Sequence, residues 1–249
     1  MKKTILFLMV LLASLSLVAC QEDAEPSYEY GYGISYGLVH GHYVGVAEVV
    51  VDKDDVVVSV KMEEYFLPYN VAKVVVEDVN NIPSDVVTVV GSRGTSYYGK
   101  YVSVNGTLFT GAVTGESGSQ SIVYSTSGVA NIEDWVKVEA NAMVYVDAVK
   151  AGTVFIANQD GTMSSYAKAD SYAKVGWTKS TTGYWTNPAS YPLGWGGNMF
   201  AFAETVVGTK MDVTGDAIGE IETGATMVDF ADYYLLTQQA YQNALAGKM

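Results

Sequence analysis

The sequence predicts an α+β fold in which antiparallel, β-rich lobes are each closed by a helix, at about residues 131–149 and 228–246. Short β-branched runs separated by turn residues indicate the strands. Apolar residues at three-to-four spacing in the two named segments indicate the helices. Because each helix follows a series of strands, the order favours a two-lobed build with its boundary near Ala151. The first lobe is expected at residues 28–151 and the second at residues 152–249.

The first lobe opens with alternating tyrosines and glycines from Tyr28 to Gly37, a pattern compatible with an edge strand or with an irregular aromatic lead-in. Val44–Val51 and Val56–Met62 are valine-rich and flank the acidic turn Asp52–Asp55, which is typical of a β-hairpin. Asn105–Gly106 is a favourable tight turn between two later strands. These later strands are expected at Val71–Val76, Val86–Val90, Tyr97–Val104, Thr107–Val113 and Ser121–Tyr124.

A helix from Asn131 to Val149 is expected to close the first lobe. Asn131 has a side chain that can cap the start of a helix, and Gly152 follows its end. The apolar residues that recur at helical spacing are Ile132, Trp135, Val136, Ala140, Met143 and Val144.

The second lobe repeats the order of strands followed by a helix. Its strands are expected at Thr153–Ala157, Met199–Val207 and Lys210–Val213. Val228–Ala246 closes the chain as a helix whose apolar residues lie on one stripe. Trp177–Gly197 holds three of the four tryptophans together with tyrosines, prolines and glycines, so we expect a rigid aromatic loop there.

Composition excludes several classes of function. The chain has 14 Lys and Arg against 27 Asp and Glu, a net charge of −13. This balance argues against a nucleic-acid partner, because binding to a phosphate backbone depends on basic residues. A single Cys excludes a disulfide scaffold and a Cys-rich zinc site. Apolar residues make up 49% of the chain, which is enough to order a folded core.

The first twenty residues have the build of a secretory signal. Lys2 and Lys3 precede the apolar run Ile5–Leu12, which is too short for an ordinary membrane-spanning helix. The segment ends in Leu17-Val18-Ala19-Cys20, which resembles the lipobox of bacterial lipoproteins.

This resemblance implies that residues 1–19 are a signal peptide cut before Cys20, and that Cys20 carries acyl chains such as palmitate. Residues 20–27 would then be a short polar tether. Loss of the two lysines leaves 12 basic and 27 acidic residues, a mature charge of −15. Lipid rather than charge would therefore hold the protein at the extracytoplasmic face of a bacterial membrane, since several acyl chains anchor stably. A plain signal peptide followed by a free Cys is the alternative.

The segment Thr223-Gly224-Ala225-Thr226 lies just before the last expected helix. Thr226 and Asp229 have the spacing of a capping box, and Gly224 allows a tight turn into the helix. Helix N-termini also bind anions, because unpaired N–H groups and the positive end of the dipole converge there. The segment is therefore either a simple helix start or an anion site.

The same four residues resemble the Ser/Thr-Gly-Ala-Thr signature of FMN-binding domains found in bacterial redox pumps and secreted flavin lipoproteins. Gly41–Gly45 and the valine-rich hairpin after it are similar to the opening of that family. The resemblance implies that Thr226 carries FMN through a phosphoester made by a separate flavin transferase. Thr223, Gly224 and Ala225 would form the recognition turn. FMN could be held covalently at Thr226 or without a covalent bond.

The chain departs from the family in two respects. Glu220 stands where the family usually has Asp, at a position that the transferase reads. About 150 residues separate the two matching ends, from Glu64 to Asp216, so the middle is an insertion, a second lobe or a sign against the match.

The aromatic loop offers a place for the flavin ring, because flat apolar walls favour ring stacking. Trp185 and Trp195 are the residues assigned to this role. A satellite aromatic core under a long loop is the alternative for the same residues. The candidates considered for stacking are Trp177, Tyr184, Trp185, Tyr191 and Trp195.

Two functions remain open. The first is an exported, lipid-anchored electron carrier with FMN at Thr226, whose partners are a flavin transferase and redox proteins. The second is a non-catalytic surface lipoprotein that binds a carbohydrate, a peptide or a protein through Trp177–Gly197. No catalytic residue is assigned, since the chain has no Gly-x-Ser-x-Gly elbow, Walker loop or dinucleotide fingerprint.

A metal site is not expected. His40 and His42 flank Gly41 and could bind a metal with Glu63 or Glu64, but two histidines without a third ligand at motif spacing are more typical of surface or turn residues. Glu63 and Glu64 are adjacent on a strand and so point to opposite faces, which favours a plain strand end over an acid and base pair.

Overall fold

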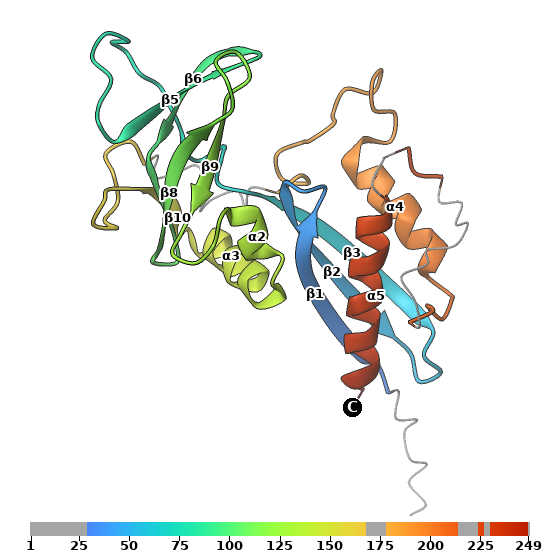
Figure 1. Ribbon diagram of the computed structural model, residues 1–249. Coiled ribbons are helices and arrows are strands. Elements are labelled where there is room, and N and C mark those ends of the chain that lie inside the picture. Colours follow the sequence, from blue (N-terminus) through green and yellow to red (C-terminus); the bar gives the residue numbers. More distant parts are fainter. Residues whose placement is uncertain (1–28, 168–177, 214–223, 227–229, 249) are drawn as a thin grey trace, which may run out of the picture.

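The computed structural model describes residues 29–167, 178–213, 224–226 and 230–248 (Figure 1). The predicted α+β class is confirmed: several antiparallel sheets are combined with helices. The strands are β1 (Gly31–Val39), β2 (Tyr43–Val51), β3 (Val57–Phe66), β4 (Lys73–Val74), β5 (Val86–Gly91), β6 (Gly94–Gly99), β7 (Tyr101–Val104), β8 (Thr107–Thr114), β9 (Ser121–Ser125) and β10 (Val154–Ala157). The helices of the described residues are α2 (Ile132–Val136), α3 (Glu139–Ala151), α4 (Gly194–Val206) and α5 (Phe230–Ala246).

Strands β1, β2 and β3 form an antiparallel meander, in which β2 is the central strand. The first hairpin pairs Gly31 with Val51 at its open end and Val39 with Tyr43 next to the turn. Helix α5 lies across β1 and β2, and α4 packs against β3 (Figure 1). The core between sheet and helices includes Val49, Phe202 and Tyr233. The first strands and the last helices therefore form one packed unit.

Two glycines of β1 explain how closely α5 approaches the sheet. Gly31 and Gly33 are buried, while the neighbouring Tyr30 and Tyr32 are exposed. A Cβ atom on Gly33 would lie 2.1 Å from the carbonyl oxygen of Ala240, so only glycine leaves room for the helix backbone. The Tyr and Gly alternation is thus an edge strand, one of the two forms that the sequence allows.

The middle of the chain forms two further sheets, with strand orders β4-β6-β5 and β10-β7-β8-β9. Helices α2 and α3 pack between these strands and the meander, as the contacts of both helices with β1 show. Tyr145 of α3 is fully buried and donates a hydrogen bond to the carbonyl oxygen of Phe66 at 2.6 Å. The shared core includes Val44, Val102 and Phe109.

The helix expected from Asn131 to Val149 is present but divided into two. The Asn131 side chain accepts a hydrogen bond from the Asp134 N–H at 2.6 Å, and Gly152 ends α3 with a φ of 70°, as expected. Val138 is extended and separates α2 from α3. Because of this break, the buried face of α3 does not continue the apolar face of α2. Met143 is therefore exposed, although an unbroken helix from Asn131 to Val149 would place it on the apolar side.

The second part of the chain differs from expectation in three respects. The run Met199–Val207, expected as a strand, is largely helix α4, and Lys210–Val213 is not a strand. The rigid loop expected at Trp177–Gly197 ends in the first turn of α4. The contacts of α5 with β1 cross the boundary expected at Ala151, and that boundary itself stays a prediction.

Several sequence predictions lie outside the described residues, namely those on Cys20, Trp177, Glu220, Thr223 and Asp229. In the part of the chain that is described, no helix combines the length and the apolar character needed to cross a lipid bilayer.

Candidate functional site

Helix α4 holds the segment that contains Thr226. Asn198, one turn into α4 and fully buried, accepts a hydrogen bond from the Thr226 N–H at 2.7 Å. The amide of Asn198 also donates to the carbonyl oxygen of Gly194 at 2.6 Å, and so ties Thr226 to the start of α4. Gly224 has a φ of 66°, the left-handed conformation that a tight turn requires and that glycine adopts without strain.

A cavity of about 450 Å³ lies at the start of α4 and is called here the α4 pocket. It is lined by residues of the segment 179–197, among them Trp185, Tyr191 and Trp195. The rings of Trp185 and Tyr191 are stacked, with centroids 5.0 Å apart and planes 11° from parallel. Trp195 is only 4% exposed, and its indole nitrogen has no hydrogen-bond acceptor among the described residues.

The structure therefore brings most of the predicted cofactor residues together at α4. Trp185 and Trp195 line the α4 pocket, and Thr226 is bound to Asn198 one helical turn beyond it. Gly224 and Ala225 precede Thr226 in the described segment, whereas Thr223 lies outside it.

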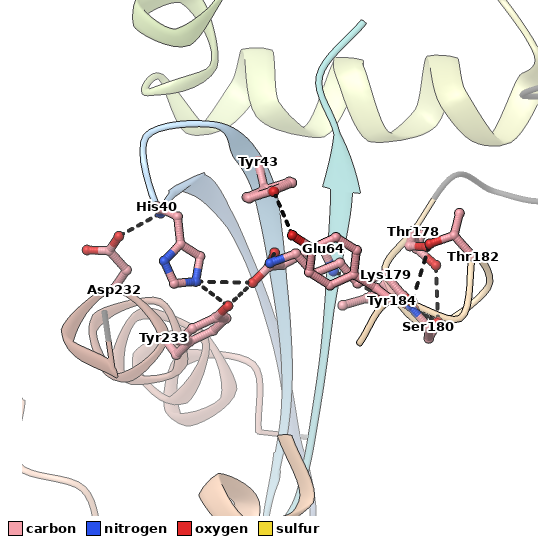
Figure 2. A network of polar contacts seen from close by, with 11 residues as sticks. His40, Tyr43, Glu64, Thr178, Lys179, Ser180, Thr182, Tyr184, Asp232 and Tyr233 are labelled. Carbon is pink, nitrogen blue, oxygen red and sulfur yellow. Dashed lines mark hydrogen bonds and ion pairs between the residues drawn. The ribbon is translucent and has the colours of Figure 1, made fainter. Parts of the chain in front are cut away.

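Lys179 lines the same pocket and is a buried cation. It is 3% exposed and forms an ion pair with Glu64 of β3, which is fully buried (Figure 2). The Lys179 ammonium also lies 4.0 Å from the ring centroid of Tyr43. The rings of Tyr184 and Trp185 follow at 4.9 and 5.5 Å. Burial of a charge is costly unless it is paired. The Glu64 carboxylate and the aromatic faces both stabilise the buried ammonium of Lys179.

A chain of polar contacts continues from Glu64 to the turn between β1 and β2. The Tyr233 hydroxyl of α5 donates to Oε1 of Glu64, and Nε2 of His40 lies 2.5 Å from the same hydroxyl (Figure 2). A phenol has one proton to donate, so His40 must supply the proton of its own bond from Nε2. Four buried or nearly buried polar groups thus run in series from His40 to Lys179, at the edge of the α4 pocket.

The end of strand β3 binds the segment 178–180, which includes Lys179. Glu63 and Glu64 point to opposite faces, as expected, and Glu63 binds the N–H and hydroxyl of Ser180. The Lys179 N–H donates to the carbonyl oxygen of Glu64 at 3.0 Å, and Thr178 bridges to Tyr65. The segment before the α4 pocket is therefore fixed to the end of β3.

Burial keeps the phenol beside Lys179 neutral. The pKa of Tyr43 is raised well above its ordinary value, first by burial, then by its hydrogen bond with Tyr184 and by the charge of Glu64. The two hydroxyls lie 3.4 Å apart. At neutral pH the Tyr43 ring next to Lys179 therefore carries no charge of its own.

Comparison of the chain with protein-family models, curated proteins and solved structures finds no match.

The histidines and glutamates take roles that the sequence did not indicate. His40 is in a turn, as expected, but it is nearly buried and binds Tyr233 instead of facing solvent. In the described residues, no group of three or more His, Cys, Asp and Glu side chains has a metal-binding arrangement. Glu64 is more than a strand end, since it pairs with Lys179. The one feature of the sequence that indicates a buried Glu64 is its position directly before the apolar run Tyr65–Leu67.

Proposed function

We propose that this chain is an exported, lipid-anchored electron carrier that holds FMN at Thr226, with the flavin ring in the α4 pocket. The observation that carries the proposal is the double hydrogen bond of Asn198, which joins Thr226 to Gly194 at the start of α4. These bonds support a common site, because they hold Thr226 at the helix whose first turn lines the α4 pocket.

The residues present fit the group. A volume of about 450 Å³ is in the range of pockets that hold small cofactors. The stacked pair Trp185 and Tyr191 gives a flat apolar wall, and the unpaired indole N–H of Trp195 is a buried donor that a polar edge of a ligand would satisfy. The start of α4 carries partial positive charge, which favours a phosphate nearby in an otherwise acidic protein.

FMN, when bound, would supply the transfer of one or two electrons. Asn198 positions Thr226, and Trp185 and Trp195 line the cavity. Lys179 contributes a buried positive charge at the edge of the cavity, partly offset by Glu64. The lipobox at Cys20 supports attachment to the extracytoplasmic face of a bacterial membrane, where the flavin transferase and redox partners would meet the protein.

Mass spectrometry of the protein co-expressed with the flavin transferase tests the attachment. We expect the peptide that contains Thr226 to gain the mass of FMN less one water, and Thr226→Val to abolish the gain. Glu220→Asp restores the acid usual in the family, and we expect it to raise the modified fraction. An unmodified Thr226 peptide in a colourless protein, for both the natural chain and Glu220→Asp, would contradict the proposal.

Recognition of a carbohydrate, peptide or protein through Trp177–Gly197 is the second candidate. Tyr191 is 43% exposed and Leu193 is exposed beside it, which favours a contact surface. Burial of Trp195 removes one of the tryptophans from such a surface. The absorbance spectrum separates the two candidates, because a recognition protein has no flavin band.

A further inference from the structure

A second cavity, of about 550 Å³, lies in the middle of the chain and is called here the β-lobe cavity. It is bounded by the β4-β6-β5 sheet on one side and by β9 and α2 on the other. None of the residues that line it lines the α4 pocket. Its volume is typical of sites for small ligands. A use for this cavity is therefore independent of flavin binding.

The register of the small sheet places three polar side chains on one wall. Lys73 of β4 is paired with Tyr98 of β6, and directly opposed residues of antiparallel strands share a face. Ser96 lies two residues before Tyr98 and so projects from the same face. All three line the cavity. The wall thus combines an aromatic ring, a hydroxyl and an ammonium group.

Positive charge gathers at this cavity in a protein that is otherwise acidic. Arg93, in the turn between β5 and β6, is the only arginine of the sequence, and it lines the cavity together with Lys73. Within the described residues, no carboxylate lies within ion-pair distance of Arg93 or Lys73. Both cations are therefore free to meet an anion that enters the cavity.

The one acidic residue at the cavity is already engaged. Glu133 of α2 accepts a hydrogen bond from the Tyr69 hydroxyl at 2.5 Å. Its carboxylate therefore has a donor of its own on the α2 side of the cavity, and in the described residues it forms no ion pair with Arg93 or Lys73.

We propose that the β-lobe cavity binds a small ring-shaped ligand that carries a carboxylate and several hydroxyls, as an acidic sugar does. The guanidinium of Arg93 matches a carboxylate with two parallel N–H donors, and Lys73 adds a second charge. The face of Tyr98 packs against the ring of the ligand, and Ser96 exchanges hydrogen bonds with its hydroxyls.

A nuclear magnetic resonance titration of the mature chain tests the proposal directly. Because Arg93 is the only arginine, its side-chain Nε–Hε group gives one signal that needs no further assignment. The probe is D-galacturonate. The matched probes are D-galactose, which lacks the carboxylate, sodium acetate, which lacks the ring, and sodium chloride at equal ionic strength.

Galacturonate is expected to shift the Arg93 signal along a saturating curve, with an affinity at least tenfold higher than that of galactose or acetate. Lys73→Gln is expected to weaken this affinity at least fivefold, whereas Lys61→Gln, which removes an exposed lysine of β3, leaves it unchanged. A shift no larger than that caused by sodium chloride would overturn the proposal. Equal affinity for acetate, or an unchanged affinity in Lys73→Gln, would overturn it as well.

Discussion

Glu64 is the buried carboxylate that links Tyr233 of α5 to Lys179. It is fully buried, yet it accepts the Tyr233 hydroxyl and pairs with Lys179, so two elements distant in sequence meet at one carboxylate. A buried ion pair contributes little net stability when intact, because desolvation offsets the attraction. Loss of one partner is different, since it leaves an uncompensated charge in a medium of low polarity.

Glu64→Gln removes the negative charge and retains the shape of the side chain. We expect it to lower the free energy of unfolding by about 3 kcal/mol, because the Lys179 ammonium remains buried without its carboxylate. Urea unfolding followed by circular dichroism measures the change. Glu48→Gln is the matched control: Glu48 pairs with the exposed Lys61, and loss of that pair is expected to cost less than about 1 kcal/mol.

The double variant Glu64→Gln with Lys179→Met separates charge from packing. Removal of both charges is expected to recover part of the stability that Glu64→Gln loses. If Glu64→Gln unfolds at the same urea concentration as Glu48→Gln, the buried pair does not carry the role assigned to it.

At the scale of elements, the contact between β1 and α5 shows how glycine spacing sets the fold. Gly31 and Gly33 alternate with exposed tyrosines, so the first part of this face of β1 has no side chains. Helix α5 lies directly on this face, and its last turns are placed by that contact. The start of α5, which carries Tyr233, is thereby aligned with Glu64.

Gly33→Ala places a methyl group 2.1 Å from the carbonyl oxygen of Ala240, and backbone atoms of a helix cannot move aside as a side chain can. We expect a loss of about 2 to 3 kcal/mol in the free energy of unfolding. In Gly37→Ala the nearest atom is Cδ1 of Leu236 at 3.4 Å, so that variant is expected to be tolerated within about 1 kcal/mol. Thermal unfolding of the two variants compares them, and equal losses would contradict direct packing of α5 on Gly33.

The strands of the first part of the chain could be predicted because valine runs and turn residues are local signals. The expected hairpin of Val44–Val51 and Val56–Met62 is confirmed as β2 and β3. Helix α4 could not be assigned in this way. Its segment Phe200–Ala203 alternates large and small residues like a strand, whereas its buried residues, among them Trp195, Phe202 and Val206, follow helical spacing.

The site could be predicted only in part, for a related reason. The signature at Thr226 and the aromatic segment around Trp185 are visible in the sequence. The hydrogen bond from Thr226 to Asn198 and the pairing of Glu64 with Lys179 join residues far apart in the chain. No periodicity or spacing signals such long-range pairs, because tertiary packing alone brings them together.

At the scale of the whole molecule, buried and half-buried tyrosines occur in several elements of the described chain. Burial is the main cause that raises the pKa of Tyr43, Tyr69 and Tyr124, and it raises the pKa of Tyr65 to about 12. These residues lie in β2, in β3, after β3 and in β9, so the effect reports on the packing of both the meander and the middle sheets. A tyrosine whose pKa is raised in the folded state holds its proton to higher pH than the same tyrosine in the unfolded chain. Its contribution to stability is therefore intact below the pKa of the unfolded chain and is lost as the pH rises above that value.

Alkaline titration is therefore expected to unfold the protein. Below pH 10, the ordinary pKa of tyrosine, both states keep the phenol protons and stability does not change through these groups. Above pH 10 the unfolded chain releases protons that the folded state retains, so the free energy of unfolding falls. Absorbance at the tyrosinate band should show exposed tyrosines titrating first and a later step that coincides with loss of circular dichroism. A single step for all 19 tyrosines with the fold intact would contradict this packing.

Flavin fluorescence of the modified protein is the most direct test that Thr226 and the α4 pocket form one cofactor site. A ring stacked beside Trp185 and Tyr191 is expected to emit far less than free FMN, because a close aromatic donor quenches it. Trp185→Leu should raise the emission severalfold, whereas Trp135→Leu, at a tryptophan that packs against Phe109, should leave it unchanged. Emission equal to that of free FMN, unchanged by Trp185→Leu, would contradict the site.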